Sequence, residues 1–128
     1  MLIILDTNFL IYCAKEKMDY IEELRNLLNE NYEIVVPEQV VGELKKLKDD
    51  RMKKVSGKDK LAVDLALQIL EKNKIKKVKA VGYTVDEAIV NLSKEDRKNI
   101  VCTLDREMRW ELGRVILISK GKKLRLTR

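Results

Sequence analysis

The opening stretch of the chain, MLIILDTNFL, joins an apolar run to an acidic residue and the start of a helical pattern. The run Met1–Leu5 contains no polar side chain, which is typical of a strand buried on both faces in a parallel sheet. Asp6 follows this strand directly, and open α/β sheets bind their ligands at the carboxyl ends of strands. Because Asp is also a good helix cap, Asp6 alone predicts either a ligand-binding carboxylate or a cap.

Strand and helix patterns alternate along the rest of the chain. Strands are predicted over 1–5, 32–36, 76–80, 98–104, 115–118 and 122–126. Helices are predicted over 7–14, 20–29, 59–72, 85–94 and 106–113, with another beginning at Pro37. This alternation indicates βαβ units and an α/β fold with a central, mainly parallel sheet, closed by an edge strand at 122–126. The 128 residues contain no linker or internal repeat, so a single domain over 1–128 is expected.

The absence of histidine restricts the available chemistry. It excludes Ser-His and Cys-His nucleophilic sites, a His general base and His-ligated zinc. Cys13 and Cys102 are isolated, so no zinc knuckle or disulfide framework is indicated. The glycines form neither a GxGxxG nor a Walker motif. An enzyme built from this chain must therefore use carboxylates, lysines or a bound metal.

Charge and hydropathy indicate which kinds of partner the chain can bind. No apolar run approaches the ~18 residues of a membrane span, and the start of the chain does not fit a signal peptide, so we expect a cytoplasmic protein that does not bind membranes. The net charge of +6 favours a polyanionic partner, although lysine-rich solvated faces are common.

Two further carboxylates have settings that point to a site. Asp105 repeats the arrangement at Asp6, because it also follows an apolar strand and precedes a predicted helix. Glu43 lies on the apolar stripe of the helix that begins at Pro37, and an inward-facing acid is costly unless it is paired or binds a cation. The alternative for Glu43 is a boundary residue paired with a lysine.

The start of the helix over 85–94 carries two acids. Thr84 and Glu87 match a capping box, which gives Glu87 a structural role. Asp86 is then free for another role, and it lies in the first turn, where the helix dipole favours negative charge.

Four carboxylates meeting at one sheet edge would repel one another and raise their pKa values unless a cation were present. Hard divalent ions such as Mg²⁺ or Mn²⁺ prefer oxygen ligands of this kind. Such a site supports phosphodiester hydrolysis, in which the metal activates water and stabilises the leaving oxygen. The alternative use for these acids is a set of surface ion pairs with the many lysines.

Four segments resemble the PIN-domain nucleases. They are LDTNFLI at 5–11, VVGELKKL at 40–47, VDEAIV at 85–90 and NIVCTLDREMRWEL at 99–112. Within that superfamily the chain looks most like the archaeal and eukaryotic branch associated with small-subunit ribosomal RNA processing. The resemblance implies a PIN-like three-layer α/β/α fold and a Mg²⁺- or Mn²⁺-dependent endoribonuclease that cleaves single-stranded RNA.

The resemblance also implies the site. The carboxylates Asp6, Glu43, Asp86 and Asp105 would be the catalytic and metal-binding residues. Behind them, Asn8 would orient Asp6, and Thr103 and Glu87 would lie close to the site. That branch often has two adjacent Asp residues where this chain has Asp86 and Glu87, and the capping box favours Asp86 as the metal ligand.

Basic side chains would hold the RNA backbone. The candidates are Lys45, Lys46, Lys48, Arg51, Arg106 and Arg109. For base stacking the chain offers Trp110 and four tyrosines, and Trp110 also fits a core or interface position.

Two other functions remain open from the sequence. One is the toxin ribonuclease of a toxin–antitoxin pair, which would share the mechanism and bind an antitoxin instead of pre-ribosomal proteins. The other is an RNA-binding module that keeps the fold without cleaving. A homodimer is also plausible by resemblance.

Overall fold

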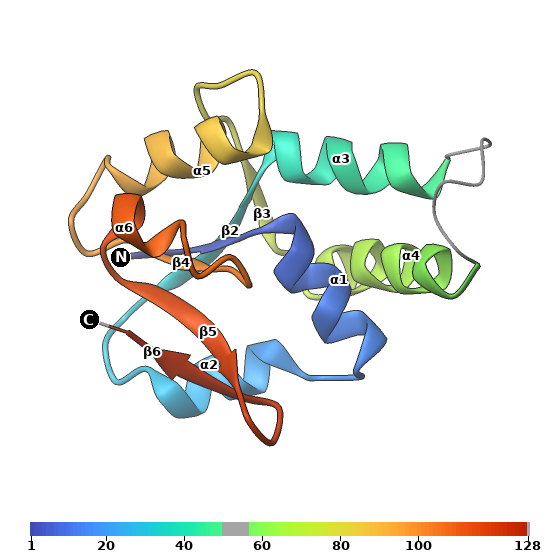
Figure 1. The fold of residues 1–128 in the computed structure, drawn as a ribbon, viewed down its shortest axis with the longest axis horizontal. Helices are drawn as coiled ribbons and strands as arrows, with labels where there is room; N and C mark the ends of the chain where they lie inside the picture. Colours follow the sequence, from blue (N-terminus) through green and yellow to red (C-terminus); the bar gives the residue numbers. More distant parts are fainter. Residues whose placement is uncertain (50–56, 128) are drawn as a thin grey trace.

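A computed structural model describes residues 1–49 and 57–127 of the chain (Figure 1). The strands are β1 (Leu2–Leu5), β2 (Glu33–Pro37), β3 (Lys76–Val78), β4 (Ile100–Cys102), β5 (Val115–Ser119) and β6 (Lys123–Leu126). The helices are α1 (Thr7–Lys15), α2 (Tyr20–Leu27), α3 (Glu38–Lys48), α4 (Gly57–Lys72), α5 (Val85–Ser93) and α6 (Arg109–Leu112). These elements confirm the alternation that the sequence predicts.

The strands form a six-stranded sheet in the order β3-β2-β1-β4-β5-β6. All neighbouring strands are parallel except the edge strand β6, which is antiparallel to β5. The chain adds β2 and β3 on one side of β1 and then returns to place β4 on the other side. The carboxyl ends of β1 and β4 therefore form a topological switch point, where open α/β sheets bind their ligands.

Helices cover both faces of this sheet. Helices α1, α3 and α4 contact one another, and α5 contacts α6, β2, β4 and also α3. Figure 1 shows α5 and α6 grouped apart from α1 and α4, with the strands running between the two groups. The predicted three-layer α/β/α architecture is confirmed, while the expectation of a single domain over 1–128 stays a prediction.

The central strand β1 explains the apolar run at the start of the chain. Ile3, Ile4 and Leu5 are completely buried, because helices cover both faces of the sheet at this position. The edge strand β6 instead alternates, with Leu124 buried and Arg125 exposed. Apolar runs and alternation therefore distinguish central from edge strands in this chain.

Helix α6 is shorter than the sequence pattern predicts, since it spans Arg109–Leu112 instead of 106–113. The Asp105 side chain accounts for the late start. Its Oδ1 accepts a hydrogen bond of 2.9 Å from the N–H of Glu107, which closes a turn where the helix was expected to begin.

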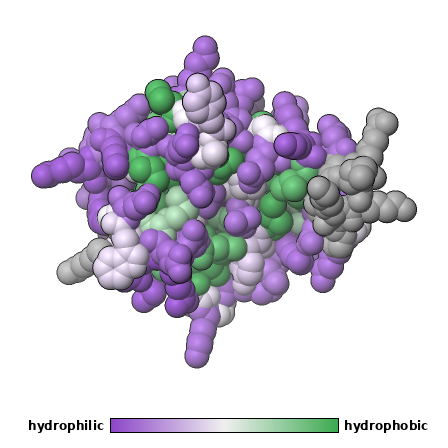
Figure 2. All heavy atoms as spheres, turned by 45° about the horizontal axis from the view of Figure 1, so that its top comes forward, coloured by the Kyte–Doolittle hydropathy of each residue, from purple (hydrophilic) through white to green (hydrophobic). Residues whose placement is uncertain are grey.

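The surface is mainly hydrophilic. Figure 2 turns the edge that carries α3 and α5 toward the viewer, and hydrophilic side chains cover most of it. The large hydrophobic side chains that remain exposed are Leu61, Leu65, Val81, Tyr83, Leu104 and Trp110. Within residues 1–49 and 57–127, no helix has both the length and the apolar composition to cross a membrane.

Candidate active site

Asp6 occupies the switch point between β1 and β4. Its N–H donates to the carbonyl of Cys102 at 3.1 Å, which continues the pairing of Leu5 with Cys102. Its side chain is 5% exposed, and its Oδ1 accepts the N–H of Thr7 at 2.8 Å as the N-cap of α1. The cap predicted for Asp6 is therefore present, and the same side chain lies where a ligand is expected.

The pKa of Asp6 is raised above its usual value. Burial is the main cause, and hydrogen bonds from Thr103 and Thr7 partly oppose it. The negative charges of Asp86 and Glu43 raise this pKa further. Three of the four predicted carboxylates are thus close enough to interact, although they come from three separate segments of the chain.

The orientation predicted for Glu43 is wrong, because its side chain is exposed. Val40 and Leu44 take the buried face of α3, and Glu43 flanks that face. Helix α3 nevertheless starts at the carboxyl end of β2, next to β1, and this position brings Glu43 within electrostatic range of Asp6. Because Glu43 flanks the buried face of α3, its carboxylate lies near Asp6 and avoids the free-energy cost of full burial.

Asp86 and Glu87 divide their roles at the start of α5. Thr84 Oγ1 accepts the N–H of Glu87 at 3.1 Å, as a helix cap does. The carboxylate of Glu87 accepts the N–H of Tyr83 at 3.0 Å, one residue before the cap. The carboxylate of Glu87 is therefore occupied by a hydrogen bond from the backbone, and Asp86 is the acid whose charge raises the pKa of Asp6.

Thr103 connects Asp6 with Asp105. The fully buried Thr103 hydroxyl donates to Asp6 Oδ2 at 2.8 Å and accepts the N–H of Asp105 at 3.0 Å. The Asp105 side chain is exposed, and its charge is not among the causes of the raised pKa of Asp6. The structure thus gathers Asp6, Glu43 and Asp86 and places Asp105 beside them through one shared hydroxyl.

The predicted orientation of Asp6 by Asn8 is corrected. In the described part of the chain, Thr7 and Thr103 provide the hydrogen bonds to the Asp6 carboxylate, and Asn8 provides none. Asn8 is exposed because it lies one residue beyond the buried first position of α1. It lines a hollow of about 400 Å³ together with Asp105 and Tyr12.

The oxygen atoms around Asp6 fit a hard divalent cation. Among residues 1–49 and 57–127, none of the four carboxylates forms an ion pair, although the chain has 27 basic residues. The hydroxyl of Thr7 is also buried without a hydrogen-bond partner there. The negative charges of Glu43 and Asp86 raise the pKa of the buried Asp6, and a cation bound there would stabilise its charged form.

Direct coordination by many side chains is not required for such an ion. Over the same described ranges, no three acidic or cysteine side chains are close enough together to enclose a metal. Mg²⁺ commonly binds through one or two carboxylates and keeps several waters. The single buried carboxylate of Asp6 is compatible with that mode of binding.

The predicted RNA-binding residues fall into two groups. Lys45, Lys46 and Lys48 are exposed on the last turns of α3, and Lys48 forms an ion pair of 2.9 Å with Asp64. Arg106 is exposed and Arg109 half-buried, both close in sequence to Asp105. Arg51 lies outside the described residues.

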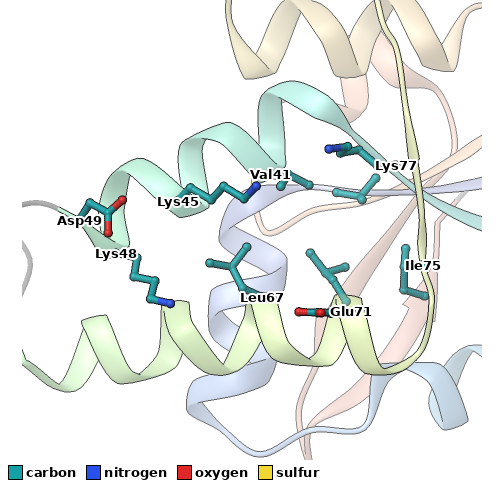
Figure 3. Close-up of a pocket in the computed structure, with 10 residues that line it drawn as sticks. Val41, Lys45, Lys48, Asp49, Leu67, Glu71, Ile75 and Lys77 are labelled. Atoms are coloured by element: carbon teal, nitrogen blue, oxygen red, sulfur yellow. The ribbon is translucent and has the colours of Figure 1, made fainter.

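A cleft of about 550 Å³ lies between α3 and α4, and its described lining residues do not include the four carboxylates. Figure 3 shows Lys48 extending from α3 toward α4 and Lys45 running along α3 toward Val41, with Leu67 on α4 and Lys77 at the other end of the cleft. The cleft thus presents part of the predicted basic surface, separate from the acidic site.

Sequence comparisons identify relatives of this chain. The profile of a family described as "PIN like domain" matches residues 3–119. The chain is 44% identical, over 113 residues, to a protein from Methanocaldococcus jannaschii named Ribonuclease VapC4. That alignment covers 86% of this chain and 81% of the relative.

Two solved structures share the fold. One is described as "Structure of the PIN domain endonuclease Utp24" and superposes with a TM-score of 0.77 at 22% identity, covering 99% of this chain and 91% of the other. The second is a domain of a functionally unknown protein from Methanocaldococcus jannaschii, with a TM-score of 0.54 and 19% identity. It covers 95% of this chain and 87% of that domain.

Proposed function

This chain belongs to the PIN-like domain family, and from that membership and the acidic site we propose that it is a metal-dependent endoribonuclease. The observation that carries the proposal is Asp6, a buried carboxylate at the switch point whose pKa is raised mainly by burial and further by two neighbouring acids. The relative named as a ribonuclease supports RNA as the substrate.

We assign the ion to Asp6, with Glu43 and Asp86 completing its surroundings and Asp105 at the edge of the site. Mg²⁺ or Mn²⁺ bound there would neutralise phosphate charge and lower the pKa of water. Thr103 occupies one oxygen of Asp6 with a hydrogen bond and Thr7 the other, so the carboxylate is held in one orientation while lone pairs remain free.

The basic groups complete the proposal. Lys45, Lys46 and Lys48 would contact phosphates on one side of the acidic site, and Arg106 and Arg109 on the side of Asp105. Arg51 extends the first group in sequence. A basic surface around a carboxylate cluster would attract the RNA backbone, while the carboxylates would bind the cation.

The decisive experiment compares wild-type protein with Asp6→Asn on a panel of single-stranded RNAs in Mg²⁺ and in Mn²⁺. Asn keeps an oxygen for the N–H of Thr7, so the helix cap survives. We expect Asp6→Asn to abolish cleavage. Asp19→Asn is the matched control, since Asp19 caps α2 through the N–H of Glu22, and it should cleave at the wild-type rate. A wild-type protein that cleaves no RNA in either ion would refute the proposal.

The biological setting is a further part of the proposal. The ribonuclease could act on ribosomal RNA precursors beside pre-ribosomal proteins, or as the toxin of a toxin–antitoxin pair. RNA crosslinked to Asp6→Asn identifies the substrate in the first case, and a tight-binding protein inhibitor encoded by a neighbouring gene identifies the second. The homodimer stays a prediction that light scattering can test.

A further inference from the structure

The loop over 80–83 exposes two apolar side chains. Val81 is 80% exposed, and Tyr83 is fully exposed. Figure 1 shows this loop at the top of the molecule, between β3 and α5 and beside the start of α3. A single exposed hydrophobic residue is common on protein surfaces, but here hydrogen bonds from two helices hold the backbone that carries the two side chains.

Three side chains fix the loop backbone. Gln39 Nε2 donates to the carbonyls of Ala80 at 2.6 Å and Gly82 at 2.9 Å. Asn91 Nδ2 donates to the carbonyl of Val81 at 2.6 Å. Glu87 Oε2 accepts the N–H of Tyr83 at 3.0 Å. The loop is therefore held from both α3 and α5, while its two apolar side chains face solvent.

Gly82 packs the loop closely against α5. Its φ is +149°, a conformation that strongly favours glycine. An added Cβ would lie 2.7 Å from the nitrogen of Ala88 and 2.8 Å from Cβ of Glu87, closer than such atoms can approach. The backbone at Gly82 thus lies directly on the first turns of α5, which sets the position of Tyr83.

The loop borders the acidic site. Gln39, which holds the loop, lies one helical turn before Glu43 on α3, and residues spaced by four share a helix face. Asp86 follows Tyr83 by three residues. In addition, residues 73–85 contain four lysines and no acid, so the approach to the loop is basic.

We propose that Tyr83 is a stacking position for an unpaired base of the RNA, next to the phosphate that is cleaved. This proposal rests on the ribonuclease function above. Aromatic side chains bind unpaired bases by stacking, whatever the base. Because the loop is already ordered, little conformational entropy is lost when the base binds. A base held at Tyr83 positions its neighbouring phosphate toward Asp86 and Asp6.

The test measures RNA affinity in the Asp6→Asn background, where no cleavage occurs. Tyr83→Ala should weaken the binding of a short single-stranded RNA roughly 5- to 150-fold, the range expected for one stacked base. Tyr83→Phe and Tyr83→Trp should bind within about threefold of the parent because they keep a ring. The Ala variant should fold normally, since it retains the N–H that Glu87 accepts.

A base-by-base control locates the contact. The same RNA is prepared with one abasic nucleotide at each position in turn. At one position, next to the cleaved phosphate, the abasic nucleotide should weaken RNA binding to the Asp6→Asn protein. The same abasic nucleotide should cause no further loss of affinity when Tyr83→Ala is also present. Leu61→Ala, which removes a similarly exposed apolar side chain from α4, should leave affinity unchanged.

Two outcomes would overturn the stacking proposal. One is an effect of Tyr83→Ala that adds to the abasic effect at every position. The other is unchanged RNA affinity in Tyr83→Ala, which would exclude a stacked base at this residue. Failure of the proposed function would look different. A wild-type protein that cleaves no RNA, but in which Tyr83→Ala and the abasic nucleotide still fail to add, would refute the ribonuclease activity and leave the stacking position in place.

Discussion

Thr103 and Asp6 are 97 residues apart in sequence, and the hydroxyl of Thr103 donates a 2.8 Å hydrogen bond to Asp6 Oδ2. The same hydroxyl accepts the N–H of Asp105 at 3.0 Å. One fully buried hydroxyl therefore ties the carboxylate at the end of β1 to the turn that follows β4. Parallel pairing of β1 with β4 makes this link possible, because it brings the ends of both strands to one level.

Replacing Thr103 with Val should impair both stability and activity. The substitution keeps the shape but leaves an oxygen of Asp6 and the N–H of Asp105 without their partner, at a cost of about 1–3 kcal/mol in the free energy of unfolding. Because this hydrogen bond lowers the pKa of Asp6, its loss should move the acidic limb of the pH–activity profile upward. We expect a drop in cleavage rate of roughly 10- to 100-fold.

Thr103→Ser is the matched control. It retains the hydroxyl, so the pH profile should stay at its wild-type position, with only a small loss of packing stability. Equal profiles for Thr103→Val and wild-type protein would show that the hydrogen bond does not influence Asp6.

The sequence predicts the parts of this fold that depend on local pattern. The run Met1–Leu5 is apolar because β1 lies at the centre of the sheet, and Asp6 ends it. The prediction for Glu43 failed because the stripe on α3 identifies the buried face only to within about one residue. Helix α6 was predicted too long because the turn closed by the Asp105 side chain competes with helix formation.

Other features depend on contacts between distant segments. Gln39 and the carbonyl of Ala80 are 41 residues apart, so no local pattern reveals that α3 holds this loop. The spacing of Gln39 and Glu43 by four residues was the available signal, since it places both on one helix face. The resemblance implied that Asn8 orients Asp6, whereas Thr7 and Thr103 make the hydrogen bonds to its carboxylate, and Thr103 is 97 residues away in sequence.

Asp6→Asn should stabilise the folded protein at neutral pH. The raised pKa of Asp6 means that the folded state binds this proton more tightly than the unfolded state, whose value is near 3.8. The stabilising contribution of the protonated Asp6 is thus complete below the unfolded pKa and is lost as pH rises through the folded pKa. The stability of wild-type protein relative to Asp6→Asn should fall over that window, as chemical denaturation between pH 3.5 and pH 7 would show.

Divalent ions should reverse this difference. An ion that binds only the folded state raises the free energy of unfolding by about 2.7 kcal/mol at 100 times its dissociation constant. We therefore expect Mg²⁺ and Mn²⁺ to raise the thermal midpoint of wild-type protein and to leave that of Asp6→Asn unchanged. An equal rise in both proteins would place the ion elsewhere.

The acids around Asp6 should differ in their influence on its titration. Asp86 has the larger effect of the two neighbouring charges, so Asp86→Asn should lower the pKa of Asp6 more than Glu43→Gln does. Asp105→Asn should leave this pKa unchanged and still reduce cleavage at least tenfold. Carbon-detected NMR of the Asp6 carboxyl group measures the titration directly. A shift in Asp105→Asn as large as that in Asp86→Asn would contradict the arrangement of the site.

The basic face of α3 should control the salt dependence of RNA binding. Each lysine that neutralises a phosphate of a single strand contributes about 0.7 to the slope of log affinity against log salt concentration. Lys45→Ala should therefore reduce that slope by about 0.7 in the inactive Asp6→Asn background. Lys48→Ala should reduce it less, because Lys48 must first give up its ion pair with Asp64. Arg25 is the control, since it lies on α2 in an ion pair with Glu22, and Arg25→Ala should leave the slope unchanged. Equal slopes for Lys45→Ala and Arg25→Ala would exclude this face of α3 from the RNA path.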